Sequence, residues 1–212
     1  DLHPRVRRQR QMCIRDRFHI SPNVKEREYL TEDEIKRIMA HEFDNPTLAL
    51  VRDLFIFACF TALSFVDMKE LTTDEIVEVN GEKWILSKRH KTNVPFQVKL
   101  LDIPLQIIER YKYLSEDRLV FGKINYWTMC KQLKKVMAEC GIEKQISYHC
   151  GRHTFGTLAL SKGMPIESVS RVLGHTNIVT TQIYAKITTQ KLDNDLSMFG
   201  NKLNASFGSV TP

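Results

Sequence analysis

The sequence predicts a mainly helical protein with one small three-stranded antiparallel sheet, an α+β fold class. Helical patterns of apolar residues fill most of the chain, and one stretch alternates like strands around an Asn80-Gly81 turn. We find no internal repeat or low-complexity tract. With 212 residues and 42% hydrophobic content, the chain can bury a sizeable core, and we expect one domain over residues 25–200.

The two ends of the chain are expected to lie outside this domain. Residues 1–17 hold six arginines and two aspartates, which is +4 of the total net charge of +6, and they show no apolar period. We interpret them as a non-native or disordered basic segment, with a DNA-contacting arm as the alternative. Residues 18–30 would form the end of a linker. Residues 201–212, rich in Gly, Ser and Asn, would form a flexible tail.

The first helices are predicted between residues 31 and 60. Thr31 and Glu34 match a capping box, so a helix should start there and run to about Phe43. Pro46 suits the first turn of a second helix, whose following residues are apolar nearly all round. We expect this second helix to be central and buried.

The predicted sheet follows. Residues 76–79 and 83–86 flank the Asn80-Gly81 turn, which is typical of a two-residue hairpin, and residues 96–100 are a plausible third strand. Helical patterns then return in six segments: 104–113, 126–139, 152–161, 165–173, 178–187 and 191–199.

Composition argues against several classes of protein. The five cysteines are odd in number and include no C-x-x-C pair, which disfavours a disulfide framework and fits a reducing cytoplasm. No apolar run reaches the length of about 18 residues that spans a bilayer, and no signal peptide begins the sequence. His149, Cys150 and His153 lack a fourth ligand at plausible spacing, so we do not expect a zinc site.

His149 and Arg152 are the first candidate catalytic pair. They are three residues apart, so on one helical turn both side chains face the same way, near a helix start that favours an anion. This arrangement suits a phosphate. The alternative is that His149 caps the helix and Arg152 makes a surface ion pair.

His175 and Tyr184 are the second pair. Nine residues apart, they would point to opposite sides of one continuous helix, so they converge only if His175 precedes the helix that carries Tyr184. Gly174 supplies a helix stop, and Thr176 or Asn177 a natural N-cap, so the sequence permits this geometry. The alternative is a buried tyrosine bonded to a neighbouring turn.

These residues resemble the motifs of the tyrosine recombinases, or phage-type integrases. Residues 149–155 (HCGRHTF) look like the H-x-x-R-H-T-F box of that family, and residues 173–176 (LGHT) with Tyr184 look like its L-G-H…Y box. Residues 61–67 (TALSFVD) resemble its T-G-L-R-x-x-E/D segment, and residues 89–92 (RHKT) its K-T hairpin. Four boxes in the right order are far more specific than any one of them.

The resemblance implies a tyrosine recombinase catalytic domain that breaks and rejoins DNA without metal, nucleotide or other cofactor. Tyr184 would attack the scissile phosphorus and form a 3′-phosphotyrosyl link. Arg152, His149 and His175 would donate to the non-bridging oxygens. Lys91 would protonate the leaving 5′-oxygen as a general acid, and its alternative is an ordinary solvated hairpin lysine.

Ser64 departs from the family pattern, which has an arginine at that place. A hydroxyl cannot replace a bidentate cation, so either the enzyme is weakened or another arginine has taken over. We favour Arg89, which lies two residues before Lys91 and therefore on the same face of the strand if the strand extends that far. Ser64 would instead cap a helix in a capping box with Asp67. We expect Asp67 to orient neighbouring groups and His153 to support the site or the core.

The resemblance also implies double-stranded DNA as the partner, in a homotetramer on two duplexes. The amphipathic segment 188–199 would dock on the next protomer, or by default fold back on its own domain. No membrane partner and no small-molecule substrate are expected. Members of the family normally carry a further helical DNA-binding domain before the catalytic one, so the sequence is a fragment or that domain was lost. A noncatalytic DNA-binding relic, favoured by Ser64, and a topoisomerase-like enzyme remain alternatives.

Overall fold

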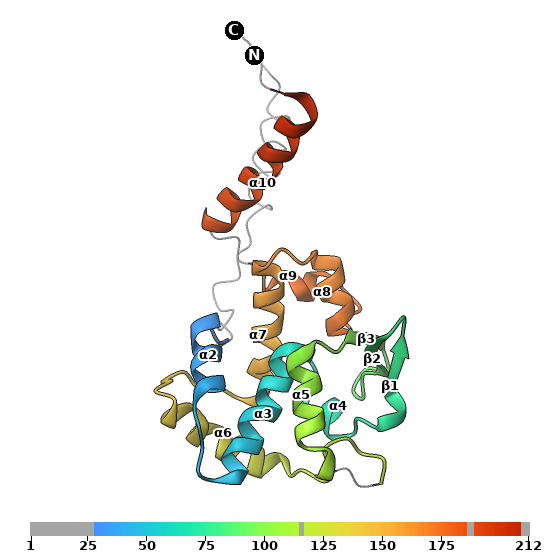
Figure 1. The fold of residues 1–212 in the computed structure, drawn as a ribbon, viewed down its shortest axis with the longest axis vertical. Helices are drawn as coiled ribbons and strands as arrows, with labels where there is room; N and C mark the ends of the chain where they lie inside the picture. Colours follow the sequence, from blue (N-terminus) through green and yellow to red (C-terminus); the bar gives the residue numbers. More distant parts are fainter. Residues whose placement is uncertain (1–27, 115–116, 186–188, 209–212) are drawn as a thin grey trace, which may run out of the picture.

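The computed structural model describes residues 28–114, 117–185 and 189–208, and these residues form a mainly helical fold with one small sheet (Figure 1). This confirms the fold class expected from the sequence. The elements, in chain order, are α2 (Glu32–Ala40), α3 (Pro46–Thr61), α4 (Phe65–Lys69), η1 (Thr73–Glu75), β1 (Ile76–Val79), β2 (Glu82–Lys88), β3 (Pro95–Lys99), α5 (Asp102–Arg110), η2 (Lys112–Leu114), α6 (Tyr126–Glu139), α7 (Tyr148–Ser161), α8 (Ile166–Leu173), α9 (Val179–Gln182) and α10 (Thr189–Phe207).

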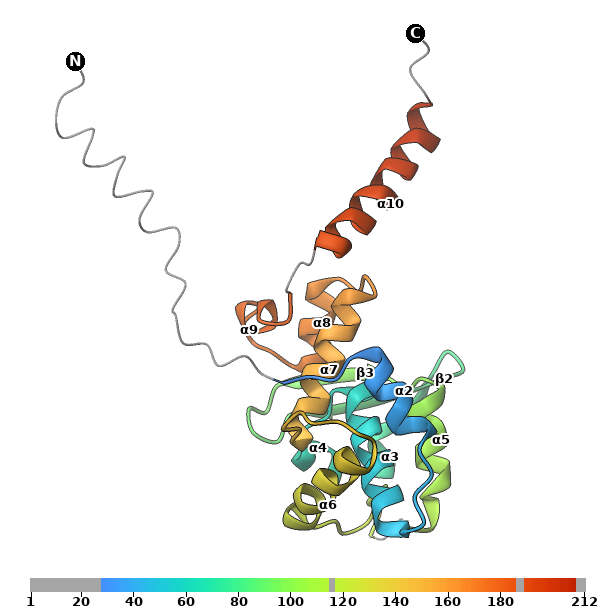
Figure 2. The ribbon, with the colours of Figure 1, turned by 90° about the vertical axis from the view of Figure 1, so that its left-hand side faces the viewer.

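Helix α3 is the centre of the structure. The Asn45 side chain caps its start, Pro46 occupies its first position, and most of its remaining residues are buried. It packs against α2, α5, α6 and α7, which surround it in both views (Figures 1 and 2). The helix ends at Thr61 because Ala62 takes a left-handed backbone conformation, with φ of 59°. The prediction of a central, buried helix is confirmed.

The sheet has the order β1-β2-β3 and is antiparallel throughout. Asn80 and Gly81, with φ of 54° and 78°, make the predicted two-residue turn with both central residues left-handed. Ile85 on β2 pairs with Ile76 and Val98, and its side chain is fully buried in the main core. The sheet lies beside α8, so the loop after β2 reaches the same region as the end of α8 (Figure 1).

Several boundaries differ from the predicted ones. Helix α7 begins at Tyr148 rather than residue 152, because Ser147 caps it together with Cys150. Helix α2 ends three residues earlier than expected, since His41 is already extended. Helix α9 is only four residues long, where a helix over residues 178–187 was expected; residues 186 and 187 of that prediction lie outside the described residues. Residues 201–207, expected as part of a flexible tail, instead continue α10.

The predictions for residues 1–17 and for most of the linker 18–30 lie outside the described residues. Leu30, at the end of that linker, is fully buried, and its amide donates to Thr154 Oγ1. The chain is thus anchored to α7 just before α2 begins. None of the described helices combines the length and the apolar character that crossing a bilayer requires.

Helix α10 stands apart from the rest of the described structure in both views (Figures 1 and 2). Its apolar residues recur at helical spacing, and each is exposed: Leu192, Leu196, Phe199 and Leu203. This stripe continues past Gly200, which explains why the helix runs beyond the expected end. The default expectation that this segment folds back on its own domain is wrong for the structure described.

Candidate active site

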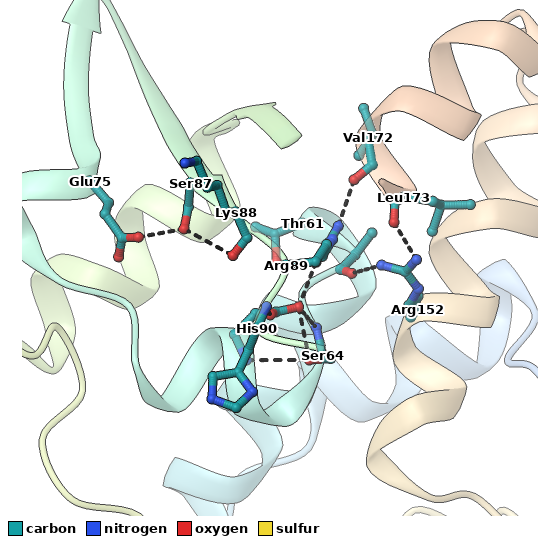
Figure 3. A network of polar contacts seen from close by, with 12 residues as sticks. Thr61, Ser64, Glu75, Ser87, Lys88, Arg89, His90, Arg152, Val172 and Leu173 are labelled. Carbon is teal, nitrogen blue, oxygen red and sulfur yellow. Dashed lines mark hydrogen bonds and ion pairs between the residues drawn. The ribbon is translucent and has the colours of Figure 1, made fainter. Parts of the chain in front are cut away.

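Helix α7 carries three of the predicted site residues, His149, Arg152 and His153. Arg152 is buried, with 8% of its surface exposed, and donates from Nη1 to the carbonyl of Ala62 at 3.0 Å and from Nη2 to the carbonyl of Leu173 (Figure 3). It therefore ties the end of α3 to the end of α8, and the alternative of a surface ion pair is wrong. Burial lowers the pKa of Arg152 to about 10, with a further contribution from Arg89, so the group stays protonated at neutral pH.

Arg89 follows β2 and reaches the same end of α8. Its Nη1 donates to Asp67 Oδ2 at 2.8 Å and its Nη2 to the carbonyl of Val172 at 2.6 Å (Figure 3). The guanidinium lies 3.8 Å from the centre of the Phe96 ring and is buried. Burial lowers the pKa of Arg89, against the opposing effect of Asp67. A Cβ at Gly174 would come within 2.9 Å of Arg89 Nε, so only glycine leaves room for this arginine.

Arg89 and Arg152 are thus both bound to the C-terminus of α8, which we call their shared anchor. The carbonyls of Val172 and Leu173, which are adjacent at the C-terminus of α8, each accept one guanidinium. Free carbonyls at a helix C-terminus carry partial negative charge and favour such cations. Arg89 nevertheless lowers the pKa of Arg152, because two positive charges are held near one another. Such a buried pair of cations is suited to receive an anion.

Asp67 links Arg89 to Ser64. Ser64 caps α4 in a capping box with Asp67, as predicted, and its Oγ donates to Asp67 Oδ2 at 2.8 Å. The amide of His90 donates to the other carboxylate oxygen at 3.0 Å. Burial alone would raise the pKa of Asp67, but the hydrogen bonds from His90 and Arg89 outweigh it, and the pKa is lowered. Asp67 is therefore an ionised residue that holds the β2–β3 loop against α4.

Tyr184 follows the short helix α9 and is buried against α7, with 8% of its surface exposed. Its hydroxyl lies 2.7 Å from His153 Nδ1, and its ring stacks on His175 at 13° with 6.5 Å between centroids. His175 precedes α9, as the spacing of these two residues required. The structure thus brings the phenol together with residues of α7 and with the segment after α8.

His175 is held by Thr181, whose Oγ1 lies 2.9 Å from His175 Nδ1. Burial lowers the pKa of His175 to about 4, and the nearby charges of Arg152 and Arg89 add to the shift. The imidazole is therefore neutral at pH 7. If Nδ1 accepts the Thr181 hydroxyl, Nε2 carries the hydrogen and can donate to an anion.

We expect His175 to titrate far below an ordinary histidine. The unfolded chain takes up this proton near pH 6.5, whereas the folded site resists it until about pH 4. The contribution of His175 to stability should therefore be lost as pH falls through this window, and be constant above it. Histidine side-chain NMR, assigned with His175→Gln, measures the pKa. Titration near 6.5 in the folded protein would contradict the expected burial.

His149 and Lys91 lie at the surface. The His149 ring is exposed and packs edge-on against His153, with 4.5 Å between centroids. Lys91 is exposed in the loop between β2 and β3. Among the hydrogen bonds and ion pairs found between described residues, none joins Lys91 to Arg152 or Tyr184. His149 thus borders the buried group, whereas Lys91 does not contact it.

Three residues near the site were missed at the sequence level. Thr181 is buried and holds His175, Phe96 lies under Arg89, and Gly156 faces the ring of Tyr184. A glycine inside the predicted helix that also carries Arg152 was the one available signal, since glycine there costs helix stability and usually reflects close packing. Among the described residues, no three His, Cys, Asp or Glu side chains gather where they could hold a metal ion.

The sequence is similar to a family of known proteins. The model of the phage integrase family matches residues 28–191. The tyrosine recombinase XerA of Pyrococcus horikoshii is 30% identical over 174 residues, which cover 77% of this chain and 58% of that protein. The tyrosine recombinase XerD of Lacticaseibacillus casei is 44% identical over 179 residues, which cover 77% of this chain and 59% of that protein. The chain thus spans about three fifths of the length of these two relatives.

Solved structures share the same fold. The XerH site-specific recombinase bound to its palindromic difH substrate superposes with a TM-score of 0.66 at 21% identity, covering 83% of this chain and 54% of that one. The Tn1549 transposon integrase in complex with a circular intermediate DNA superposes with a TM-score of 0.67 at 16% identity, covering 89% of this chain and 74% of that one. At these identities the likeness establishes the fold.

Proposed function

The chain belongs to the phage integrase family, and from this premise we propose that it is a site-specific tyrosine recombinase, the integrase of a mobile element. Its substrate would be double-stranded DNA, broken and rejoined without metal or nucleotide. The observation that carries the proposal is the convergence of a phenol, a buried guanidinium and a neutral imidazole, from Tyr184, Arg152 and His175. A nucleophile beside buried cationic donors is the arrangement that phosphoryl transfer requires.

In this reaction the Tyr184 oxygen attacks the scissile phosphorus and loses its proton. The bond from phosphorus to the 5′-oxygen breaks, and the leaving oxygen takes a proton from Lys91, which the β2–β3 loop would bring to the DNA. Arg152, His175 and His149 donate to the non-bridging oxygens, where negative charge builds up. Attack by a 5′-hydroxyl on the resulting 3′-phosphotyrosyl link reverses these steps and joins the strands.

Arg89 would supply the guanidinium that the family carries at the place of Ser64. Ser64 Oγ and Arg89 Nη1 both bind the same oxygen of Asp67, each at 2.8 Å, so the Arg89 guanidinium lies close to the position of Ser64. The shared anchor with Arg152 at the end of α8 also supports a joint role in binding one phosphate. Asp67 would orient Arg89 rather than touch DNA.

Assembly as a homotetramer on two duplexes is the second part of the proposal. The exposed apolar stripe of α10, with Leu192, Leu196 and Phe199, has no covering surface within the described chain. An amphipathic helix of this kind is stabilised when its apolar face is buried against another surface. Docking of α10 on the next protomer would provide that surface and couple the subunits.

A nicked suicide duplex tests the proposal. Duplexes built from the sequences that flank the reading frame trap the covalent intermediate, because the short cleaved strand diffuses away and cannot be rejoined. We expect a covalent protein–DNA adduct, insensitive to a chelator, that mass spectrometry maps to the peptide containing Tyr184. Failure of every duplex to form an adduct while DNA still binds would support the noncatalytic relic.

A further inference from the structure

We infer that His153 is the general base that takes the proton of Tyr184 during attack and returns it when the strand is rejoined. The inference rests on the proposed function, since it assigns a role within that reaction. The family resemblance pointed only to support of the site. The contacts of His153 suggest a direct role.

The first observation is the contact itself. His153 Nδ1 lies 2.7 Å from the phenolic oxygen, within the range in which a proton passes between heavy atoms. Both groups are buried, with 4% of His153 and 8% of Tyr184 exposed. Bulk water therefore has poor access to the proton, whereas the imidazole is within hydrogen-bond distance of it.

The second observation is that α7 is shaped to hold the ring of Tyr184. A Cβ at Gly156 would lie 2.9, 3.0 and 3.2 Å from three ring atoms, so only glycine admits the ring there. His153 and Gly156 are three residues apart and share one face of α7. The amide of Tyr184 donates to the carbonyl of Thr181 at 3.0 Å, which fixes the main chain at the other end of the side chain. The direction of the hydroxyl toward His153 is thus set by packing.

Three other described groups near the phenol are less suited to accept its proton: Arg152, His175 and His149. Arg152 is protonated and donates to two carbonyls. The His175 ring lies nearly parallel to the Tyr184 ring, with 6.5 Å between centroids, and its Nδ1 is used by Thr181. His149 is exposed, and its ring packs edge-on against the His153 ring. A phenol with an ordinary pKa near 10 must lose its proton on attack, and a neutral imidazole is a suitable acceptor near pH 7.

The phenolic O–H bond breaks as an N–H bond forms on His153 Nδ1, and the phenolic oxygen bonds to phosphorus as the bond to the 5′-oxygen breaks. The starting tautomer carries its hydrogen on Nε2. In the reverse step the same proton returns to the phenol when phosphorus leaves it.

Gly156→Ala tests whether cleavage depends on the packing of the Tyr184 ring against Gly156 of α7. The added methyl group meets the Tyr184 ring, so the hydroxyl must move away from His153. A misplacement of about 1 Å lowers a rate by about 10²-fold, and we expect a loss of cleavage of that order. Alanine is the better helix former, so α7 itself should not be weakened. Ser161→Ala, an exposed substitution at the last residue of the same helix, is the control and should cleave like the parent chain. Unchanged cleavage in Gly156→Ala would show that the packing of the Tyr184 ring against this glycine has no role in the reaction.

His153→Ala and His153→Asn test the proton transfer. Both should lower single-turnover adduct formation on the suicide duplex, by about 10² to 10⁴-fold for loss of a general base. Asparagine places an amide near the Nδ1 position, so it can still bond the phenol but cannot take its proton. Added imidazole should restore part of the activity of His153→Ala. His41→Asn, on the loop before α3, is the control and should behave like the parent chain, and thermal unfolding shows that each variant is folded.

The outcomes separate the inference from the proposed function. A His153→Asn variant that cleaves like the parent chain would mean that His153 only positions the phenol, and unchanged cleavage in His153→Ala would remove it from the reaction. In both cases a Tyr184-dependent adduct leaves the proposed function intact. If the parent chain forms no adduct, or Tyr184→Phe forms as much as the parent, the proposed function fails and the inference fails with it.

Discussion

Tyr184→Phe is expected to abolish the covalent adduct between protein and DNA. Phenylalanine keeps the ring against Gly156 but removes the oxygen that is proposed to attack phosphorus. The suicide duplex measures the adduct on a denaturing gel. No residual signal is expected, because the covalent bond cannot form.

The same variant should fold and bind DNA like the parent chain. It loses the hydrogen bond to His153, and a typical bond of this kind contributes about 1 kcal/mol. Thermal unfolding and a gel-shift assay check these two points. Tyr113→Phe is the matched control, since Tyr113 is 75% exposed and far from the site, and its adduct should be undiminished. An adduct that persists in Tyr184→Phe places the nucleophile elsewhere.

Arg89→Ala is expected to have the second large effect, on both stability and cleavage. Removal of the guanidinium leaves the buried carboxylate of Asp67 without its cation, and breaking a buried ion pair in this way costs about 3–5 kcal/mol. The remaining bonds from Ser64 and His90 should keep the loss near the lower end of that range. Cleavage by the folded fraction should fall by at least about 10²-fold, the usual effect of losing a charge-stabilising donor.

Three comparisons make the Arg89 prediction specific. Arg118→Ala removes an exposed arginine that pairs with Asp74, with 76% of its side chain exposed, and should change stability by less than about 0.5 kcal/mol. DNA binding by Arg89→Ala should be retained in a gel-shift assay. Ser64→Arg in the Arg89→Ala background should recover part of the cleavage, because it returns a guanidinium to the place where the family carries one. Cleavage by Arg89→Ala at the parent rate would exclude Arg89 from the site.

Much of the fold could be predicted from local sequence signals. The bounds of α6 agree with the prediction because Asn125 caps its start and its apolar residues repeat regularly. The hairpin was found because Asn80 and Gly81 take positive φ readily. Helix α9 was overestimated, because its helical spacing extends past the point where Tyr184 turns in to pack on α7. The end of this helix is therefore determined by tertiary contacts, which cannot be predicted from the local spacing of apolar residues.

The candidate site was predicted less completely than the fold. The order of the motifs and the break after Gly174 were enough to expect that His175 and Tyr184 converge. The bond between His153 and Tyr184 joins residues 31 positions apart, and the bond between Arg89 and the carbonyl of Val172 joins residues 83 positions apart. Such pairings depend on how α7, α8 and the β2–β3 loop pack together, and no local rule specifies them.

The shared anchor at the end of α8 has a mechanical consequence. Because one short helix supplies consecutive carbonyls to both guanidinium groups, any tilt or slide of that helix would change both of these hydrogen bonds at the same time. A partner that displaced α8 would therefore alter the orientation of both cations at once, without contacting either arginine.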